Sequence, residues 1–250
     1  MFIDTHCHLS IEDYDDIEQV VLENRKEGVS PIIISGCTKS SIIESLDYGE
    51  RFFDVFVTIG YHPSEASIVN AQDLKNLEIQ LKNPKVVGIG EIGLDYHYGK
   101  EDREKQIKLF EYQLALAEKM NLPVVIHSRD ATLDTIQILK KYSVCGVIHC
   151  FSGSLETAKE YVKMGFVLGI GGVVTFKNSK LGEIVSQIPL EKIVLETDSP
   201  YLTPSPYRGE KNSSKYIPLI AIKISDCKQV PVDVVAKTTT ETARSIFHLD

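Results

Sequence analysis

Phe-Ile-Asp-Thr-His-Cys-His, at residues 2–8, is an apolar run that ends in two histidines two positions apart. Alternate side chains of a β-strand lie on the same face, so Asp4, His6 and His8 are expected to point the same way. Two imidazoles about one pleat repeat apart can bind a single cation at ordinary metal–nitrogen distances. The stretch therefore predicts a short strand near the N-terminus that presents a metal site, as in parallel barrels.

Similar segments recur along the whole chain. Short apolar runs rich in β-branched residues alternate with amphipathic stretches, and most runs are apolar at consecutive positions, as in strands covered on both faces. The predicted strands are 2–8, 31–37, 56–62, 86–91, 123–127, 146–151, 166–171 and 193–198. The predicted helices include 11–27, 71–82, 103–119, 131–142, 155–163 and 179–187, with a final helix at 231–247.

The repeated strand–helix order predicts an α/β protein with a parallel sheet. Eight such units in about 200 residues favour a single (β/α)8 TIM barrel. An open doubly wound sheet is the alternative. The final helix is expected to pack outside the barrel or to cap it. Because no linker or low-complexity tract interrupts the pattern, residues 1–250 are expected to form one domain.

Composition narrows the class further. The chain has 250 residues, of which 43% are hydrophobic, enough for a sizeable core. No stretch approaches the roughly 20 apolar residues of a membrane span, so no membrane association is expected. Polar residues interrupt the first apolar run, which argues against a secretion signal. The five cysteines are odd in number and form no CxxC pair, which predicts reduced thiols in a cytoplasmic protein.

The net charge of −8 argues against a protein that coats nucleic acids through a basic surface. Attraction to a phosphodiester would have to be local, through metal ions and a few arginine or lysine side chains. Acidic composition weakens a nucleic-acid interpretation without removing it.

Metal-capable side chains recur at the predicted carboxyl ends of the strands, where barrel enzymes carry their chemistry. Five of the seven histidines lie there. Taken singly, such a histidine is more often a half-buried packing residue, Glu91 can cap a helix, and Asp198 can form an Asx turn before Pro200. The occurrence of all these residues at the carboxyl-terminal rim of one predicted barrel indicates a metal site. The residues concerned are His6, His8, His62, Glu91, His127, His149 and Asp198.

Six ordered motifs make the chain resemble the TatD family of metal-dependent hydrolases, within the amidohydrolase-like barrels. The resemblance spans essentially all of the chain and implies a (β/α)8 barrel with two metal ions. It also implies DNase activity, described for the family as 3′–5′ exonuclease trimming of single-stranded DNA. The motifs are Phe-Ile-Asp-Thr-His-Cys-His (2–8), Gly-Tyr-His-Pro (60–63), Gly-Glu-Ile-Gly-Leu-Asp-Tyr (90–96), Pro-Val-Val-Ile-His-Ser-Arg (123–129), His-Cys-Phe-Ser-Gly (149–153) and Leu-Glu-Thr-Asp-Ser-Pro-Tyr-Leu (195–202), followed by Tyr-Arg-Gly (207–209).

The resemblance also implies a ligand set. Residues that match His6, His8 and Asp198 hold one metal in the family pattern. Those that match His127 and His149 hold the second, and Glu91 bridges the two. One departure follows Tyr-Arg-Gly, where the family usually continues with two residues and then Asn-Glu-Pro. Here the chain keeps the asparagine but not Glu-Pro, which leaves substrate preference at this loop open; the residues are Glu210, Lys211, Asn212, Ser213 and Ser214.

The expected reaction is hydrolysis of a phosphodiester by water that two divalent ions activate. Asp198 is the candidate general base, beside the bridging Glu91. His62 and Arg208 are expected to contact phosphate, and Tyr201 is a candidate to stack on a base, although ordinary packing is the commoner role of any one loop tyrosine. Glu196 is expected either to orient a ligand histidine or to make a buried structural hydrogen bond. Imidazole ligands favour Zn²⁺, Mn²⁺, Co²⁺, Ni²⁺ or Fe²⁺ over Mg²⁺, which the resemblance nevertheless allows.

Two other functions fit the same residues. A barrel of this kind can hydrolyse another ester or amide bond, for example as a D-aminoacyl-tRNA deacylase, because a fold does not fix a substrate. Glu91 stands where amide hydrolases often carry a modified lysine, which argues against the amide branch. A non-catalytic protein that keeps its metals for stability is the third interpretation. Single-stranded DNA is the expected partner, and no obligate protein partner is expected.

Overall fold

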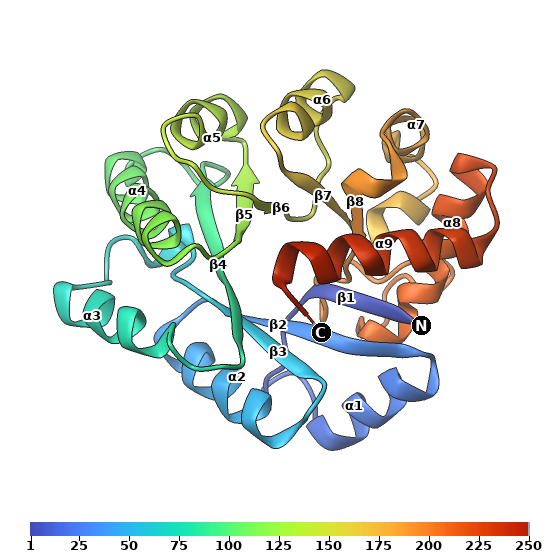
Figure 1. The fold of residues 1–250 in the computed structure, drawn as a ribbon, viewed down its shortest axis with the longest axis horizontal. Helices are drawn as coiled ribbons and strands as arrows, with labels where there is room; N and C mark the ends of the chain where they lie inside the picture. The colour runs from blue at the N-terminus through green and yellow to red at the C-terminus, as the bar shows by residue number, and fades with distance from the viewer. Residues whose placement is uncertain (250) are drawn as a thin grey trace. The chain divides into compact units, whose positions relative to one another are not determined.

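The computed structural model describes residues 1–249, so Asp250, the last residue of the predicted domain, lies outside them. Strands and helices alternate along this part of the chain (Figure 1). The strands are β1 (Phe2–Cys7), β2 (Val29–Gly36), β3 (Val55–Ile59), β4 (Val86–Asp95), β5 (Val124–Arg129), β6 (Gly146–Ile148), β7 (Val167–Ile170) and β8 (Ile193–Leu195). The α-helices are α1 (Ile17–Lys26), α2 (Lys39–Arg51), α3 (Ala71–Gln80), α4 (Arg103–Met120), α5 (Thr132–Leu139), α6 (Leu155–Lys163), α7 (Leu181–Gln187), α8 (Ile217–Lys228) and α9 (Val232–Phe247).

The strands follow one another in the sheet in sequence order, from β1 to β8. Neighbouring strands run parallel, as in the pairs β1–β2, β4–β5 and β7–β8. Sequence order and parallel direction require a crossover between consecutive strands, which the helices supply. The predicted α/β class and parallel sheet are therefore confirmed.

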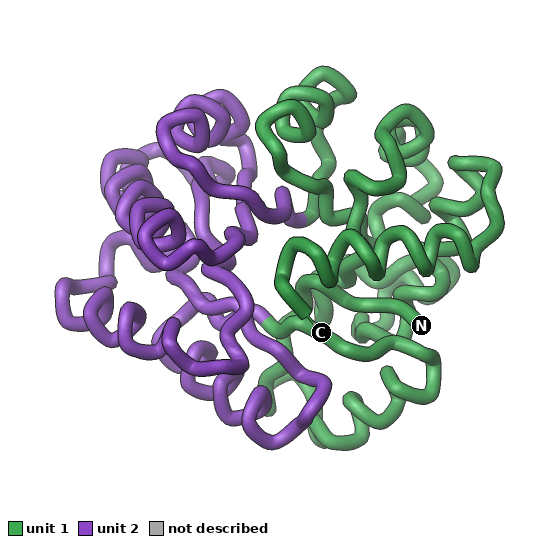
Figure 2. The backbone as a smooth tube through the Cα atoms, in the orientation of Figure 1, with its two compact units in different colours: residues 1–34, 150–250 green, residues 35–149 purple. Residues whose placement is uncertain are grey.

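Two compact units make up the chain, coloured separately in Figure 2. Unit 1 contains Met1–Ile34 and Cys150–Asp250, and unit 2 contains Ser35–His149. In unit 1 the C-terminal helix α9 packs on β1, β8 and α8. In unit 2, α2 packs on β3 and α4 packs on β4. The predicted single domain stays a prediction.

Each unit has a core of branched aliphatic side chains. Ile3 and Val194 are buried in unit 1, and Ile89, Ile92 and Val125 are buried in unit 2. All of these positions except Ile92 belong to the apolar runs that predicted the strands, and burial of apolar surface is the main driving force for their packing. None of the helices in residues 1–249 combines the length and the apolar character that crossing a membrane requires.

The limits of β4 differ most from the prediction. The sequence predicts a strand at 86–91 that ends at Glu91, whereas β4 continues to Asp95. Ile92 and Leu94 extend the apolar face and are fully buried, and Asp95 pairs with Arg129 of β5. Glu91 therefore lies inside the strand and not at its end.

Other predicted strands are shorter in the structure. β3 ends at Ile59, β6 at Ile148 and β8 at Leu195. His62, His149 and Asp198 consequently lie in the segments that follow these strands, which corrects their predicted position at strand ends.

Helices α2 and α8 lie outside the predicted ranges, and α2 has a readable start signal. The hydroxyl of Thr38 accepts a hydrogen bond from the Ser41 amide at 3.1 Å. The Ser41 hydroxyl accepts one from the Thr38 amide at 2.9 Å. This reciprocal capping satisfies two of the backbone donors that a helix N-terminus leaves open. The predicted final helix is confirmed as α9, which begins directly after Pro231.

Candidate metal centre

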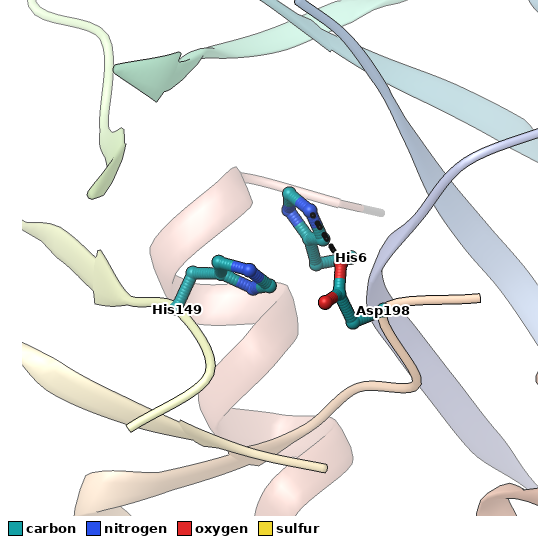
Figure 3. A group of neighbouring side chains, drawn as sticks. All are labelled: His6, His149 and Asp198. Carbon is teal, nitrogen blue, oxygen red and sulfur yellow. Dashed lines mark ion pairs between the residues drawn. The ribbon is translucent and has the colours of Figure 1, made fainter. Parts of the chain in front are cut away.

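In unit 1, the end of β1 and the segment after β8 bring His6, His8 and Asp198 together. The Nε2 atoms of His6 and His8 are 3.2 Å apart. Oδ1 of Asp198 lies 3.6 Å from Nε2 of His6 and 3.5 Å from Nε2 of His8. Figure 3 shows the His6–Asp198 pair as a dashed line and also labels His149, which belongs to unit 2.

The spacing of these three atoms fits one divalent cation. Ligand atoms bound tetrahedrally at about 2.0–2.1 Å from a zinc ion are separated by about 3.3 Å. The observed separations of 3.2, 3.5 and 3.6 Å are close to this value. Two imidazoles and one carboxylate also form a donor set that suits Zn²⁺ and its neighbours in the first transition series. His6, His8 and Asp198 can thus hold a metal ion without rearrangement of the backbone.

Backbone hydrogen bonds place Asp198 beside the two histidines. The Asp198 amide donates to the carbonyl of His6 at 3.0 Å, and the His8 amide donates to the carbonyl of Ser199 at 2.7 Å. The segment after β8 therefore continues the parallel pairing with β1 beyond the end of the strand. This pairing explains why a loop residue reaches the metal site.

Two buried polar residues, whose roles the sequence analysis missed, support the loop. Asp4 accepts hydrogen bonds from the Thr197 amide at 3.0 Å and from the Thr197 hydroxyl at 2.6 Å. Asn212 donates from Nδ2 to the carbonyls of Thr197 at 2.9 Å and Tyr201 at 2.5 Å. Burial raises the pKa of Asp4 to about 7, although the hydrogen bond from Thr197 acts to lower it. The asparagine retained in the divergent loop thus has a structural role.

In unit 2, Glu91, His127 and His149 form a second cluster on β4, on β5 and directly after β6. Oε1 of Glu91 lies 2.6 Å from Nδ1 of His127 and 3.6 Å from Nε2 of His149. Ligand atoms of the three residues all lie within 4.8 Å of one another. Glu91 is only 5% exposed, so its carboxylate has little access to water. Two imidazoles facing a buried carboxylate are again a donor set for a divalent cation.

Asp95 is a further member of this cluster. Its Oδ2 atom lies 3.1 Å from Nε2 of His127, the ring nitrogen that faces away from Glu91. A histidine that binds a metal usually donates its other N–H to a carboxylate, which fixes the tautomer and orients the ring. Donation from Nε2–H to Asp95 leaves Nδ1 of His127 for the metal beside Glu91.

Sequence reasoning missed Asp95 because it ended the strand at Glu91. The signal was present, since Ile92 and Leu94 continue the apolar alternation and place Asp95 on the same face as Glu91. Gly93, with φ of +149°, allows β4 to approach β5 here, because a Cβ atom would lie 1.9 Å from the His127 carbonyl oxygen.

The charges around His127 determine when it can bind a metal. Burial acts to lower the pKa of His127, but the Glu91 carboxylate and the hydrogen bond to Asp95 raise it to about 9. Since only neutral imidazole binds a metal, a proton competes with the cation below this pH.

Metal binding at the Glu91 cluster should therefore strengthen as the pH rises towards 9. Below that value, each ion bound should release about one proton from His127, so the affinity should fall about tenfold per pH unit. Calorimetric titration with Mn²⁺ in buffers of different ionisation enthalpy measures the proton release. The exposed His97→Gln variant should release the same number of protons as the wild type, and an absence of release at pH 7 would contradict the assignment.

Removal of the Asp95 carboxylate should weaken metal binding without removing a ligand. We expect Asp95→Ala to lower the affinity about 10–100-fold, the usual effect of losing the partner of a ligand histidine. Asp95→Asn should lower the metal affinity less than Asp95→Ala does, because the amide oxygen of asparagine can still accept a hydrogen bond from Nε2–H of His127. Competition with a chromophoric chelator measures the affinities. Asp130→Ala, which removes the exposed carboxylate beside His97, is the matched control.

Of the predicted substrate contacts, His62 lies beside the second cluster. Its ring is 4.6 Å from the ring of His127, measured between centroids. Its Nδ1 accepts a hydrogen bond from the Ser64 amide at 3.1 Å and lies 2.8 Å from the Ser64 hydroxyl. These contacts engage Nδ1 and orient the ring of His62.

Arg208 and Tyr201 both lie in the loop that carries Asp198. The Arg208 guanidinium lies 3.8 Å from the ring centroid of Phe176 and donates to the carbonyl of Thr203 at 3.0 Å. Tyr201 is 61% exposed, as a stacking residue must be. Their predicted contacts with substrate stay predictions.

Glu196 makes the buried hydrogen bond that the sequence analysis considered. It is fully buried, and its Oε1 accepts from the Cys150 amide at 2.5 Å. Gly169 leaves room for this side chain, because a Cβ atom there would lie 2.0 Å from Oε2 of Glu196. The bond joins the segment after β6 to the segment after β8.

Known proteins match this chain over nearly its whole length. A family model for TatD related DNase matches residues 3–248. YabD of Bacillus subtilis (strain 168), an uncharacterized metal-dependent hydrolase, is 40% identical over 255 residues, with 100% of both chains covered. YcfH of Escherichia coli (strain K12), which has the same description, is 34% identical over 258 residues, covering 99% of this chain and 96% of that protein.

A solved structure also shares the fold. YjjV, a TatD homolog from Escherichia coli K12, matches with a TM-score of 0.93 and 29% identity, covering 100% of this chain and 98% of that chain. The predicted TIM barrel with an additional C-terminal helix is thereby confirmed. The chain therefore belongs to the TatD family of metal-dependent hydrolases.

Proposed function

We propose that this protein is a metal-dependent phosphodiesterase that digests single-stranded DNA from its 3′ end. The observation that carries the proposal is the spacing of His6, His8 and Asp198, which matches the coordination of a divalent cation. The second cluster, around Glu91, supports it with a donor set of the same kind. The matching family model, described as TatD related DNase, supports a nucleic-acid substrate.

The proposal includes a single centre of two metal ions, with Glu91 as the bridging ligand. The carboxyl ends of all eight strands of a TIM barrel open on one face, and active sites of such barrels lie there. The residues of each cluster lie in the carboxyl-terminal half of a strand or in the segment that follows it. Zinc, manganese, cobalt, nickel, iron and magnesium are the candidate ions.

The charge of this centre favours an anionic substrate. Four neutral imidazoles and two carboxylates contribute two negative charges against four positive charges from two divalent ions. The centre keeps a net positive charge, which attracts a phosphodiester despite the chain's net charge of −8. A neutral amide or ester would gain less from it.

When bound, the two ions would activate water and neutralise charge on the phosphate. Asp198 would accept the proton of the attacking water, since its carboxylate lies beside the two histidines that would hold the same ion. Asp95 would keep His127 in the tautomer that leaves Nδ1 for the metal. His62 would donate a hydrogen bond from Nε2 to a phosphate oxygen, and Arg208 would use donors not bonded to Thr203.

Digestion of end-labelled single-stranded DNA tests the proposal. Purified protein with added Mn²⁺ or Mg²⁺ should shorten the strand, and EDTA should stop the reaction. A ladder from 5′-labelled DNA that shortens one nucleotide at a time would establish digestion from the 3′ end. Intact DNA in the presence of protein that binds metal would refute the nuclease and direct the search to ester substrates, including D-aminoacyl-tRNA.

A cytoplasmic location is part of the same proposal. None of the five cysteines, all within residues 1–249, forms a disulfide bond, which agrees with a reducing compartment.

A further inference from the structure

A groove of about 550 Å³ lies in unit 1 between the segments that follow β6 and β7. We call it the Phe176 groove. Its volume falls within the range of small-molecule sites. Among the described residues that line it, none is acidic and one is a lysine. The lining includes Ser152, Ser154, Phe176, Asn178, Lys180 and Ile184.

One wall of the groove is joined to the loop that carries Asp198, and the other is joined to β7. The Ser205 amide donates to the hydroxyl of Thr175 at 2.8 Å, one residue before Phe176. The Phe151 amide, one residue before Ser152, donates to the Gly169 carbonyl at 3.0 Å. The groove is therefore built on the same loop layer of unit 1 as the metal ligand Asp198, at the carboxyl ends of the strands.

Phe176, which lines the groove, also contacts Arg208 in the loop that carries Asp198. The guanidinium lies 3.8 Å from the ring centroid, within the range of a cation–π contact. Phe176 is half-buried and lines the groove, so its ring is held in place before any ligand arrives. Lys180 adds an exposed positive charge at the groove.

The groove contains the kinds of group that bind nucleotides. These are an aromatic ring, a lysine, and neutral hydroxyl and amide groups. Nucleobases stack on aromatic side chains irrespective of sequence, while lysine and arginine attract the phosphates that flank them. The absence of acidic groups among the described lining residues matters in a chain of net charge −8, because that net charge repels a polyanion.

We infer that the Phe176 groove binds a nucleobase, with its adjoining phosphate, of a single strand whose scissile bond lies at the metal centre. The base packs against Phe176 and the phosphate pairs with Lys180. This inference rests on the proposed function and extends it, because it assigns a part of the substrate beyond the scissile bond to a defined surface.

Equilibrium binding of 5′-fluorescein-labelled oligothymidylates tests the inference. Strands of two to six nucleotides, with phosphorothioate linkages that resist hydrolysis, are titrated with Mn²⁺-loaded protein and followed by fluorescence anisotropy. Wild-type affinity should rise at the length that reaches the groove. Phe176→Leu should raise the Kd of the longer strands at least about fivefold, as expected for loss of one base–aromatic stack. Phe176→Tyr, which keeps the ring, should bind as the wild type does.

Lys180→Ala gives a second measurement that does not depend on the packing of Phe176. It should reduce the slope of log Kd against log salt concentration by about 0.7, the value for one phosphate contact on a single strand. Lys159→Ala, on the exposed face of α6, should leave the slope unchanged. The inference would be overturned if Phe176→Leu bound with wild-type affinity and Lys180→Ala kept the wild-type salt dependence of Kd. It would also be overturned if the wild type did not bind these strands.

Hydrolysis of bis(p-nitrophenyl) phosphate by the wild type, measured in parallel, separates the two proposals. If neither the diester nor single-stranded DNA is hydrolysed but the groove variants lose affinity as described, the proposed function fails and the groove stands as a nucleic-acid site. If it is hydrolysed and the variants bind normally, only the groove inference fails.

Discussion

Asp198→Asn should lower kcat for single-stranded DNA and for bis(p-nitrophenyl) phosphate by about 10³-fold. The carboxylate lies 3.5–3.6 Å from two imidazole nitrogens, where it would balance the charge of a bound cation. An amide of the same shape brings no negative charge and cannot accept a proton from water at neutral pH. The expected loss is therefore chemical and leaves the fold intact.

The measurement is steady-state kinetics at several Mn²⁺ concentrations, so that weaker metal binding and slower chemistry are separated. Glu210→Gln is the matched control, because this exposed carboxylate lies in the same loop. It should keep kcat within about twofold, as expected for a surface substitution. Comparable activity of Asp198→Asn and the wild type at saturating metal would remove Asp198 from the reaction.

Glu91→Gln should reduce both the metal content and the activity. Oε1 of Glu91 lies 2.6 Å from His127 and 3.6 Å from His149, so its charge is central to the second cluster. Because Glu91 is buried, no solvent-exposed group can readily replace it. We expect the stoichiometry to fall from two ions per chain to at most one, and kcat to fall about 10³-fold or more.

Elemental analysis of dialysed protein gives the stoichiometry, and the diester assay gives the activity. Glu78→Gln is the control in unit 2, since it removes only an exposed ion pair with Lys119 and should change neither quantity. Two tightly bound ions in Glu91→Gln would show that this carboxylate is not a ligand, and the single bridged centre would then have to be abandoned.

Local patterns were sufficient to predict the main elements. Consecutive apolar residues flanked by polar helical stretches gave all eight strands, because a strand covered on both faces must be apolar on both. The predicted range 155–163 coincides with α6, where Ser154 accepts a hydrogen bond from the Thr157 amide and so sets the start of the helix. Such caps are local and readable.

Strand ends were less predictable, and this affected the site. A strand continues as long as its neighbour offers pairing partners, and β5 pairs with β4 as far as Asp95 and Arg129. The end of β4 is therefore set by β5, which lies about 30 residues further along the chain, and not by the sequence of β4 itself. Ending β4 early concealed Asp95, the residue that orients His127.

The sequence by itself determined the parallel α/β fold and the pair of histidines at the end of β1, with His6 in the strand and His8 directly after it, because periodicity and spacing are properties of neighbouring residues. Only the tertiary structure showed how Asp198 reaches them. Its loop is held by Asp4, which contacts Thr197 across 193 positions of the chain, and by Asn212. The Phe176–Arg208 pair likewise joins two separate loops. Contacts of this kind form only when packing brings distant segments together, so they leave no periodic trace in the sequence.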